Sequence, residues 1–172
     1  NANDAPTITS NAVTTATEDS AYSYTVEASD ADGDTLTMTG TTVPSWLSFN
    51  AATGVLSGTP ANANVGTSGN DVVITVADGN NGQVTDTFTI TVANTNDAPT
   101  VANAISDAST DEDAAYSLSI SNVFADVDTG DSCTYSMSGA PSTITLSGTT
   151  ISGTPVNADV GTHTIVVTCT DG

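Results

Sequence analysis

Apolar and polar residues alternate along several short stretches of this chain. Residues 22–28, 72–76 and 84–92 each place aromatic or aliphatic side chains at alternate positions, with Asp86 as the exception, and most of the residues between them are Ser, Thr or other polar residues. A period of two is typical of β-strands with one buried face and one face in water. Gly, Asn, Asp and Pro separate these stretches at intervals of about eight to twelve residues, a spacing typical of all-β folds. The pattern predicts a two-sheet Greek-key sandwich.

The whole pattern occurs twice. Asn3-Asp4-Ala5-Pro6 returns as Asn96-Asp97-Ala98-Pro99, and the turns and alternating stretches that follow return in the same order. Further matches are Glu18 to Ser23 with Glu112 to Ser117, Asp30-Ala31-Asp32 with Asp126-Val127-Asp128, and Ser57 to Pro60 with Ser152 to Pro155. A unit of about 95 residues has the size of one sandwich domain. We therefore expect two tandem domains, residues 1–95 and residues 96–172.

The second unit ends before the position of the stretch 84–92. Phe88, Ile90 and Val92 of that stretch should each contribute about 1.5–3 kcal/mol by burial, a large part of the roughly 5–15 kcal/mol that stabilises a small domain. The second domain is therefore expected to be C-terminally incomplete, without its last strand. Two explanations stay open: the chain is a segment cut from a longer array, or a strand from a neighbouring chain fills the gap.

Charge narrows the possible partners. The 172 residues contain 20 acidic residues, one histidine and no lysine or arginine, which gives a formal charge of −20. Such a chain repels phosphate backbones and anionic membrane surfaces, so nucleic acid is excluded as a partner. No stretch approaches the roughly 20 apolar residues of a membrane helix. Because a starting Met and an apolar leader are absent, Asn1 is expected to begin a mature or excised fragment.

Carboxylates recur at the ends of the predicted strands. Asp30 and Asp32 follow the first alternating stretch, and Asp78 follows the stretch 72–76. If those strands run in the same direction, all three carboxylates emerge at one end of the domain, where Asn3-Asp4 also enters. An oxygen-only cluster of this kind suits Ca²⁺, which takes six to eight oxygen ligands at about 2.3–2.6 Å. The alternative is that these are solvated turn residues, since Asp and Asn favour turns.

The opposite end of the first domain should carry a second acidic group. Glu18 precedes the first alternating stretch and belongs beside the exit segment of the domain. With the acidic turns of the second unit it would form a cluster at the junction between the domains. The expected junction ligands are Glu18, Asn94, Asn96, Asp97, Asp126, Asp128 and Asp171. An EF-hand is excluded, because the glycine of the turn starting at Asp30 comes two positions early and Thr41 occupies the twelfth position.

Several motifs together resemble the bacterial cadherin-like domains of the dystroglycan-type, immunoglobulin-like group. They are the Asn-Asp-Ala-Pro linkers, Glu-Asp before a Tyr-containing strand, Asp-Ala-Asp-Gly-Asp, Trp46-Leu47-Ser48-Phe49, Leu56-Ser57-Gly58-Thr59-Pro60 and Ala77-Asp78-Gly79. The resemblance covers nearly the whole chain. It implies a seven-stranded sandwich, calcium at the domain junctions, and a place in long tandem arrays of secreted or surface-anchored adhesins.

The resemblance also implies roles for individual residues. Glu18 resembles the basal glutamate of the family, Asp30 and Asp32 the apical aspartate pair, Asp78 the late apical aspartate, and Asn96-Asp97 the linker ligands. Animal cadherins carry Leu-Asp-Arg-Glu where this chain has Leu56-Ser57-Gly58-Thr59-Pro60, which removes two acidic ligands. Fewer calcium ions per junction and a weaker affinity are therefore expected.

Both cysteines, Cys133 and Cys169, lie in the second unit, which excludes a repeated cysteine metal site. Their counterparts in the first unit are Leu36 and Val76, which belong to inward-facing rows. The two cysteines should sit at similar heights on their strands, so we predict a disulfide formed in an oxidising, extracellular setting. The alternative is that each cysteine replaces a core aliphatic residue.

No catalytic set emerges from the sequence. His163 is the only histidine and is most simply a solvated residue at the start of a strand, while Trp46 lies between residues expected in the core. The leading hypothesis is a non-enzymatic, calcium-stiffened structural or adhesive spacer of an extracellular bacterial surface protein. Its partners would be neighbouring repeats or subunits, and a cell-surface glycan or protein. The alternatives are a self-assembling filament subunit completed by strand donation and a carbohydrate- or protein-binding module.

Overall fold

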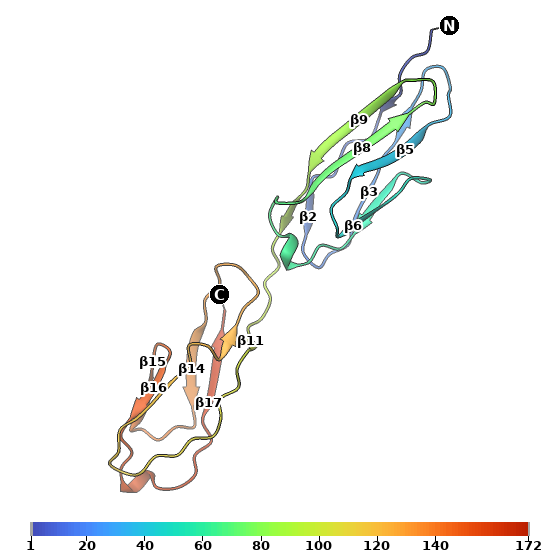
Figure 1. The fold of residues 1–172 in the computed structure, drawn as a ribbon. Helices are drawn as coiled ribbons and strands as arrows, with labels where there is room; N and C mark the ends of the chain where they lie inside the picture. Colours follow the sequence, from blue (N-terminus) through green and yellow to red (C-terminus); the bar gives the residue numbers. More distant parts are fainter. Residues whose placement is uncertain (1, 172) are drawn as a thin grey trace. The chain divides into compact units, whose positions relative to one another are not determined.

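The structure, a computed structural model that describes residues 2–171, contains two compact units. Unit 1 ends at Thr95 and unit 2 begins at Asn96. Both units consist of β-strands and one short 3-10 helix each, as Figure 1 shows. The all-β prediction is therefore confirmed. None of the helices formed by the described residues is long and apolar enough to cross a membrane.

Unit 1 is a sandwich of two antiparallel sheets with two additional strand pairs. Its strands are β1 (Thr7–Ile8), β2 (Thr15–Thr17), β3 (Tyr22–Thr25), β4 (Ala28–Ser29), β5 (Thr37–Thr42), β6 (Leu47–Asn50), β7 (Val55–Gly58), β8 (Asp71–Ala77), β9 (Gln83–Thr89) and β10 (Thr91–Ala93). One sheet has the order β3-β7-β6 and the other the order β5-β8-β9, and these two sheets form the layers visible in Figure 1. Strand β1 pairs with β4, and β10 pairs in parallel with β2.

The alternating stretches of unit 1 form its core. Tyr22 and Tyr24 of β3 are buried while Ser23 and Thr25 are exposed, and the even-numbered apolar residues of β8 are completely buried. Trp46 is half-buried, and its ring meets that of Tyr22 edge-on at a centroid distance of 5.7 Å. The period-two pattern therefore identified the inward faces of these strands correctly.

The stretch 84–92 is two strands in the structure rather than one row. Strand β9 pairs with β8, but after Ile90 the backbone changes partners. The Ile90 N–H donates to the carbonyl of Asn70 at 3.0 Å, and the Thr91 N–H donates to the carbonyl of Thr14 at 2.9 Å. The chain thus leaves the β8 sheet and continues as β10 beside β2. Alternation continues through this switch, so the hydrophobic pattern alone does not reveal it.

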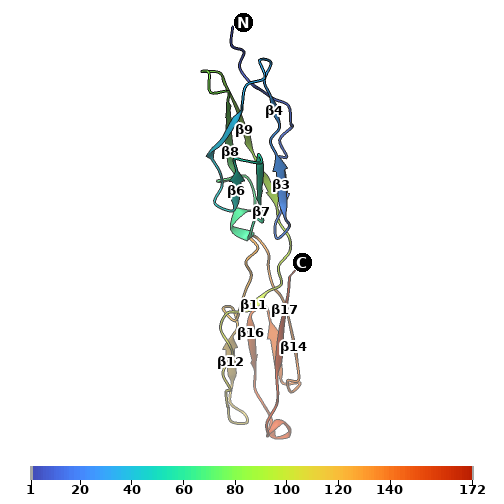
Figure 2. The same ribbon diagram turned by 90° about the vertical axis from the view of Figure 1, so that its right-hand side faces the viewer.

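Unit 2 repeats most of this arrangement. Its strands are β11 (Thr100–Val101), β12 (Tyr116–Ser119), β13 (Phe124–Ala125), β14 (Thr134–Ser138), β15 (Ile144–Ser147), β16 (Thr150–Gly153) and β17 (Val166–Thr170). Figure 2 shows β12 and β16 on one side of unit 2 and β14 and β17 on the other. The orders are β12-β16-β15 and β14-β17, so among the described residues β17 has one hydrogen-bonded neighbour where its counterpart β8 has two.

The core of unit 2 is smaller than that of unit 1. Ile120, Val123, Ile144 and Ile151 are the buried hydrophobic residues that form it. The predicted disulfide is present: Cys133, just before β14, is bonded to Cys169 in β17, with their Cα atoms 5.2 Å apart. The bond joins the two strands of the smaller sheet. It links residues that lie 36 positions apart in the sequence.

Candidate metal centre

The acidic turns of unit 1 meet at one end of its sandwich. Asp30 follows β4 and Asp78 follows β8, and each offers a carboxylate oxygen within 4.8 Å of the others and of an oxygen of Asp34. Asp78 is held in place by its own turn, because the N–H groups of Asn80 and Gly82 donate to its Oδ1 at 2.7 and 2.9 Å. The structure therefore brings together three carboxylates without any cationic side chain.

The N-terminal segment docks onto these turns through two hydrogen bonds. The Asn3 side-chain amide donates to Asp78 Oδ2 at 2.8 Å, and the Asp4 N–H donates to Asp32 Oδ2 at 2.7 Å. The Asp32 N–H in turn donates to Asp30 Oδ1 at 2.8 Å. The Asn-Asp pair of the repeated motif is thus a docking element for the acidic turns.

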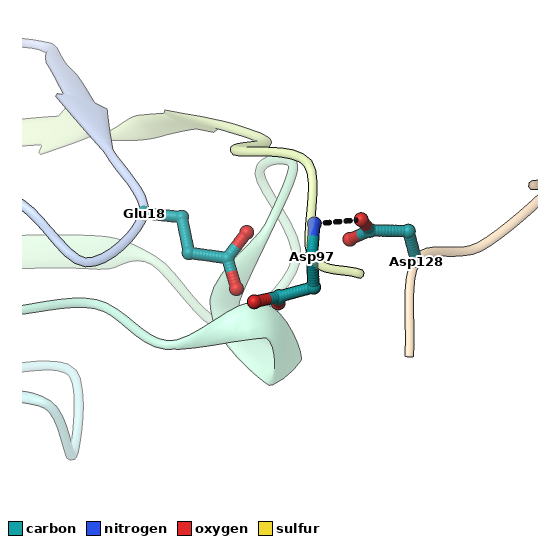
Figure 3. Close-up of side chains that lie close together, drawn as sticks. All are labelled: Glu18, Asp97 and Asp128. Atoms are coloured by element: carbon teal, nitrogen blue, oxygen red, sulfur yellow. Dashed lines mark hydrogen bonds between the residues drawn. The ribbon is translucent and has the colours of Figure 1, made fainter. Parts of the chain in front are cut away.

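Unit 2 contains the same set of contacts. The Asn96 side-chain amide donates to Asp171 Oδ2 at 3.1 Å, and the Asp97 N–H donates to Asp128 Oδ2 at 2.6 Å, the bond drawn in Figure 3. The Asp128 N–H donates to Asp126 Oδ1 at 2.9 Å. Asp126, Asp128 and Asp131 also offer oxygens within 4.8 Å of one another. Each repeat therefore builds an acidic corner, in which an Asn-Asp segment is docked by equivalent hydrogen bonds onto a cluster of turn carboxylates.

One oxygen in each corner is buried without a hydrogen-bond partner. These atoms are Oδ2 of Asp30 and Oδ2 of Asp126, which occupy equivalent positions in the two repeats. A buried carboxylate oxygen without a donor is costly, because it loses its hydration and gains nothing in return. A hard divalent cation bound by several oxygens would remove that cost. The donor set of both corners therefore fits Ca²⁺.

Hydrogen bonding also favours the charged form of Asp78. The bond from Asn3 is the main cause, and the backbone donors Asn80 and Gly82 add to it, so the pKa of Asp78 lies below its ordinary value even though burial acts in the opposite direction. Asp78 therefore remains an anion, the form that a cation needs, down to lower pH than a free aspartate.

Glu18 lies at the other end of unit 1 and is almost completely buried, with 2% of its surface exposed. The Thr95 N–H donates to Glu18 Oε2 at 3.2 Å, and the Thr95 hydroxyl donates to the Glu18 carbonyl at 3.1 Å. The Glu18 N–H itself donates to the carbonyl of Ala93 at 2.9 Å. Glu18 thus fixes the chain where it leaves unit 1. Asn94, in contrast, is exposed and makes no hydrogen bond to Glu18 in the part of the chain that the structure describes.

The structure adds four residues to those singled out from the sequence. Asp34 joins the unit 1 corner and accepts a hydrogen bond from the Asn80 side-chain amide at 2.9 Å. Asp131 joins the unit 2 corner although its turn is one residue longer. Thr95 anchors Glu18. The Asp-Ala-Asp-Gly-Asp spacing could have indicated Asp34, whereas nothing in the sequence pattern singles out Asn80 or Thr95.

Comparison with known families identifies the repeat. The family described as "Putative Ig domain" matches residues 5–93 and again residues 98–172. The chain belongs to this family. Both matches coincide with the two repeats seen in the sequence, and modules of this family are structural rather than enzymatic.

Two relatives are adhesins of one bacterial species. The chain is 39% identical over 140 residues to the "Serine-rich adhesin for platelets" of Staphylococcus aureus strain MRSA252, a match that covers 80% of this chain and 10% of the adhesin. The same protein of strain MSSA476 is also 39% identical over 140 residues, with 6% of the adhesin covered. The chain therefore spans a tenth or less of these relatives.

A solved structure of two cadherin repeats has a similar fold. Human protocadherin-24 EC1-2 matches with a TM-score of 0.56 and 20% identity, over 99% of this chain and 97% of the other. This likeness confirms the cadherin- and immunoglobulin-like architecture expected from the motifs.

Proposed function

We propose that this chain is a calcium-binding spacer of an extracellular bacterial adhesin. The observation that supports this most strongly is the repetition of one acidic corner in both units. Each corner combines clustered carboxylates, an Asn-Asp segment docked onto them and a buried oxygen without a partner. Buried polar atoms without a hydrogen-bond partner are rare in native structures. Turns that only face water would therefore not be expected to contain such an oxygen at the same position in both repeats.

Calcium would neutralise carboxylates that the chain cannot neutralise itself. In unit 1 the ion would be held by Asp30, Asp34 and Asp78, and in unit 2 by Asp126, Asp128 and Asp131. A bound Ca²⁺ supplies two positive charges and a demand for six to eight oxygens. The turns of each corner already position their oxygens through hydrogen bonds to neighbouring N–H groups, so little reorganisation is required.

Residues 95–97, which connect the two units, would link calcium binding to the freedom of the chain between them. The Thr95 N–H is bonded to Glu18 in unit 1, and the Asp97 N–H is bonded to Asp128 in unit 2. Two residues of extended chain reach at most about 7 Å. Calcium held by Asp128 and its partners in the unit 2 corner would fix the carboxylate that binds the Asp97 N–H, and would therefore restrict the few backbone torsions that connect the units. This is the basis of the proposed stiffening.

The proposed location rests on the relatives and on the disulfide. The staphylococcal relatives are adhesins by name, and a bond between Cys133 and Cys169 persists in oxidising compartments. We infer a place on the bacterial surface within a tandem array. Neighbouring repeats of the same protein are its first partners, and a surface molecule of another cell is the partner of the array.

The proposal is tested by calcium titration of protein freed of metal with a chelator. We expect saturable binding by calorimetry, and a longer maximum dimension by small-angle scattering in calcium than in chelator. Asp126→Asn should weaken binding, while Glu27→Gln, which removes one charge from an exposed residue outside both corners, should not. Absence of saturable binding, or equal weakening by both variants, would reject the proposal.

A further inference from the structure

Two short segments from opposite ends of the unit 1 sequence lie side by side. Strand β2 pairs with β10 in parallel, with Thr15 opposite Thr91 and Ala16 opposite Val92. All other strand pairs formed by residues 2–171 are antiparallel. Strands β2 and β10 therefore run in the same direction along the domain.

Tension on the chain would act along these two strands. The chain enters unit 1 where Asn3 is bonded to Asp78 and leaves it where Thr95 is bonded to Glu18, and Figure 1 shows the entry and the exit at opposite ends of the unit. A pull on both ends draws β2 back toward the entry and β10 forward toward the exit. Because the two strands are parallel, this pull slides one strand past the other. The hydrogen bonds between them then carry the load together instead of breaking one pair at a time.

Backbone hydrogen bonds extend the pairing beyond both ends of β2. The Thr91 N–H donates to the carbonyl of Thr14 at 2.9 Å, and the Glu18 N–H donates to the carbonyl of Ala93 at 2.9 Å. The inner side of the pair faces the core, since Val92 is buried there. Hydrogen bonds in such a low-dielectric setting are stronger than hydrogen bonds in water.

Glu18 adds contacts at the exit end of this pair. Its Oε2 accepts a hydrogen bond from the Thr95 N–H at 3.2 Å, and its carbonyl accepts one from the Thr95 hydroxyl at 3.1 Å. Thr95 is the last residue of unit 1, so these bonds continue the contact to the point where a pull would reach the domain. A charged acceptor forms a stronger hydrogen bond than a neutral one. The buried carboxylate of Glu18 therefore strengthens the contact where the load is applied.

Both segments are also attached to the rest of unit 1. Val92 exchanges two backbone hydrogen bonds with Gly66, at 2.8 and 2.9 Å. The Asp19 N–H, just after β2, donates to the carbonyl of Pro60 at 2.9 Å. A load on either segment is therefore passed to the body of the domain.

We infer that residues 14–18 and 91–95 form a clamp that resists tension on unit 1, and that the side chain of Glu18 stabilises its exit end. This function goes beyond the proposed calcium binding, because the contacts of the clamp are hydrogen bonds within unit 1 itself. The clamp joins the first and last parts of the unit, so it must break before the sandwich can open under a pull. The rate of forced unfolding then depends on the clamp rather than on the global stability of the unit.

The first test is single-molecule force spectroscopy on the whole chain, held by tags at its two ends, in chelator. The two units are told apart by the length that each releases, because the disulfide keeps the chain between Cys133 and Cys169 closed in unit 2. Glu18→Ala removes the acceptor of the Thr95 N–H and should raise the unfolding rate of unit 1 at constant force about tenfold or more. Glu18→Gln keeps an acceptor oxygen and should raise it much less.

The second test compares two exposed threonines whose removal does not disturb the core. Thr95→Ala deletes the hydroxyl that donates to the Glu18 carbonyl and should raise the unfolding rate under force about two- to tenfold. Thr89→Ala is the matched control, because it deletes a hydroxyl that donates to Asp71 Oδ1 at 2.6 Å outside the clamp, and should leave that rate unchanged.

Two results would overturn the inference: equal acceleration by Thr95→Ala and Thr89→Ala, or an unchanged rate in Glu18→Ala. If Glu18→Ala does not fold, the comparison of the two threonine variants decides alone. All these measurements are made without calcium. The clamp can therefore fail while the calcium proposal stands, and the calcium titration can fail while the clamp stands.

Discussion

The side-chain amide of Asn3 donates a hydrogen bond to Asp78 Oδ2 at 2.8 Å, although 75 residues separate the two. This bond is the main reason why the pKa of Asp78 lies below its ordinary value of 3.8. The folded state therefore binds the Asp78 proton less tightly than the unfolded chain does. The resulting stabilisation is present above about pH 3.8 and is lost as the pH falls through the lowered pKa.

We therefore predict that Asn3→Ala lowers the unfolding midpoint of unit 1 at pH 6 and that this difference shrinks below pH 3. Asn11→Ala, at an exposed asparagine nearby in the sequence, is the control and should change neither value. Thermal unfolding followed by the fluorescence of Trp46, which lies in unit 1, measures both. A difference that stays constant from pH 6 to pH 2.5 would show that Asp78 is not the partner that matters.

The buried oxygens of Asp30 and Asp126 that lack a hydrogen-bond partner predict that replacing either aspartate changes stability in opposite directions with and without calcium. In chelator, Asp30→Asn replaces a buried, unpartnered carboxylate with a neutral group, so unit 1 should become slightly more stable. In calcium the same change removes a ligand, so unit 1 should become less stable than the wild type. Asp126→Asn should do the same in unit 2 alone. Calorimetry in both buffers tests this, and a change of one sign in both would contradict the metal assignment.

Asn70 connects a loop to the core of unit 1. With 1% of its surface exposed, it accepts a hydrogen bond from Trp46 Nε1 at 2.9 Å and donates to the carbonyls of Asn64 and Gly66. Asn70→Ala leaves these groups without partners and should cost about 2–4 kcal/mol of folding free energy, since each buried unsatisfied group costs about 1–3 kcal/mol.

Denaturant unfolding monitored through Trp46 measures this cost. Asn62→Ala, in the preceding 3-10 helix, is the comparison and should cost much less, because that residue is partly exposed. If the two variants prove equally stable, the buried asparagine does not have the structural role that its three hydrogen bonds indicate.

The sequence predicted the strands better than their pairing. Alternation located the buried faces around Tyr22 and Ile74 because burial repeats locally, every second residue. It did not predict that the chain changes sheets after Ile90, since the new partner carbonyl belongs to Thr14 and no local pattern records it. The acidic corners were accessible from the repeat itself, which marks Asp30 and Asp126 as equivalent. The contributions of Thr95 and Asn80 depend on turn geometry and could not be predicted from composition or spacing.

Gly58 and Gly153 occupy equivalent positions in the two repeats, and both positions require glycine for the same steric reason. A Cβ atom at Gly58 would collide with the carbonyl oxygen of Trp46, and one at Gly153 would collide with that of Thr143. Both are backbone contacts between paired strands, so they cannot be relieved by a rotamer change. Gly58→Ala should destabilise unit 1, and Gly153→Ala unit 2, each by about 1–3 kcal/mol. Ser57→Ala and Ser152→Ala are the neighbouring controls, and calorimetry that resolves both units should show no comparable loss for them.

The disulfide should stabilise only the unit that contains it. Closing a loop of 36 residues between Cys133 and Cys169 is worth about 2–4 kcal/mol. Reduction should therefore lower the unfolding midpoint of unit 2 and leave the Trp46 signal of unit 1 unchanged. The double variant Cys133→Leu with Cys169→Val installs the unit 1 counterparts and should recover part of the loss, because both positions face the core. A fall in the midpoint of unit 1 on reduction would mean that the two units do not unfold independently.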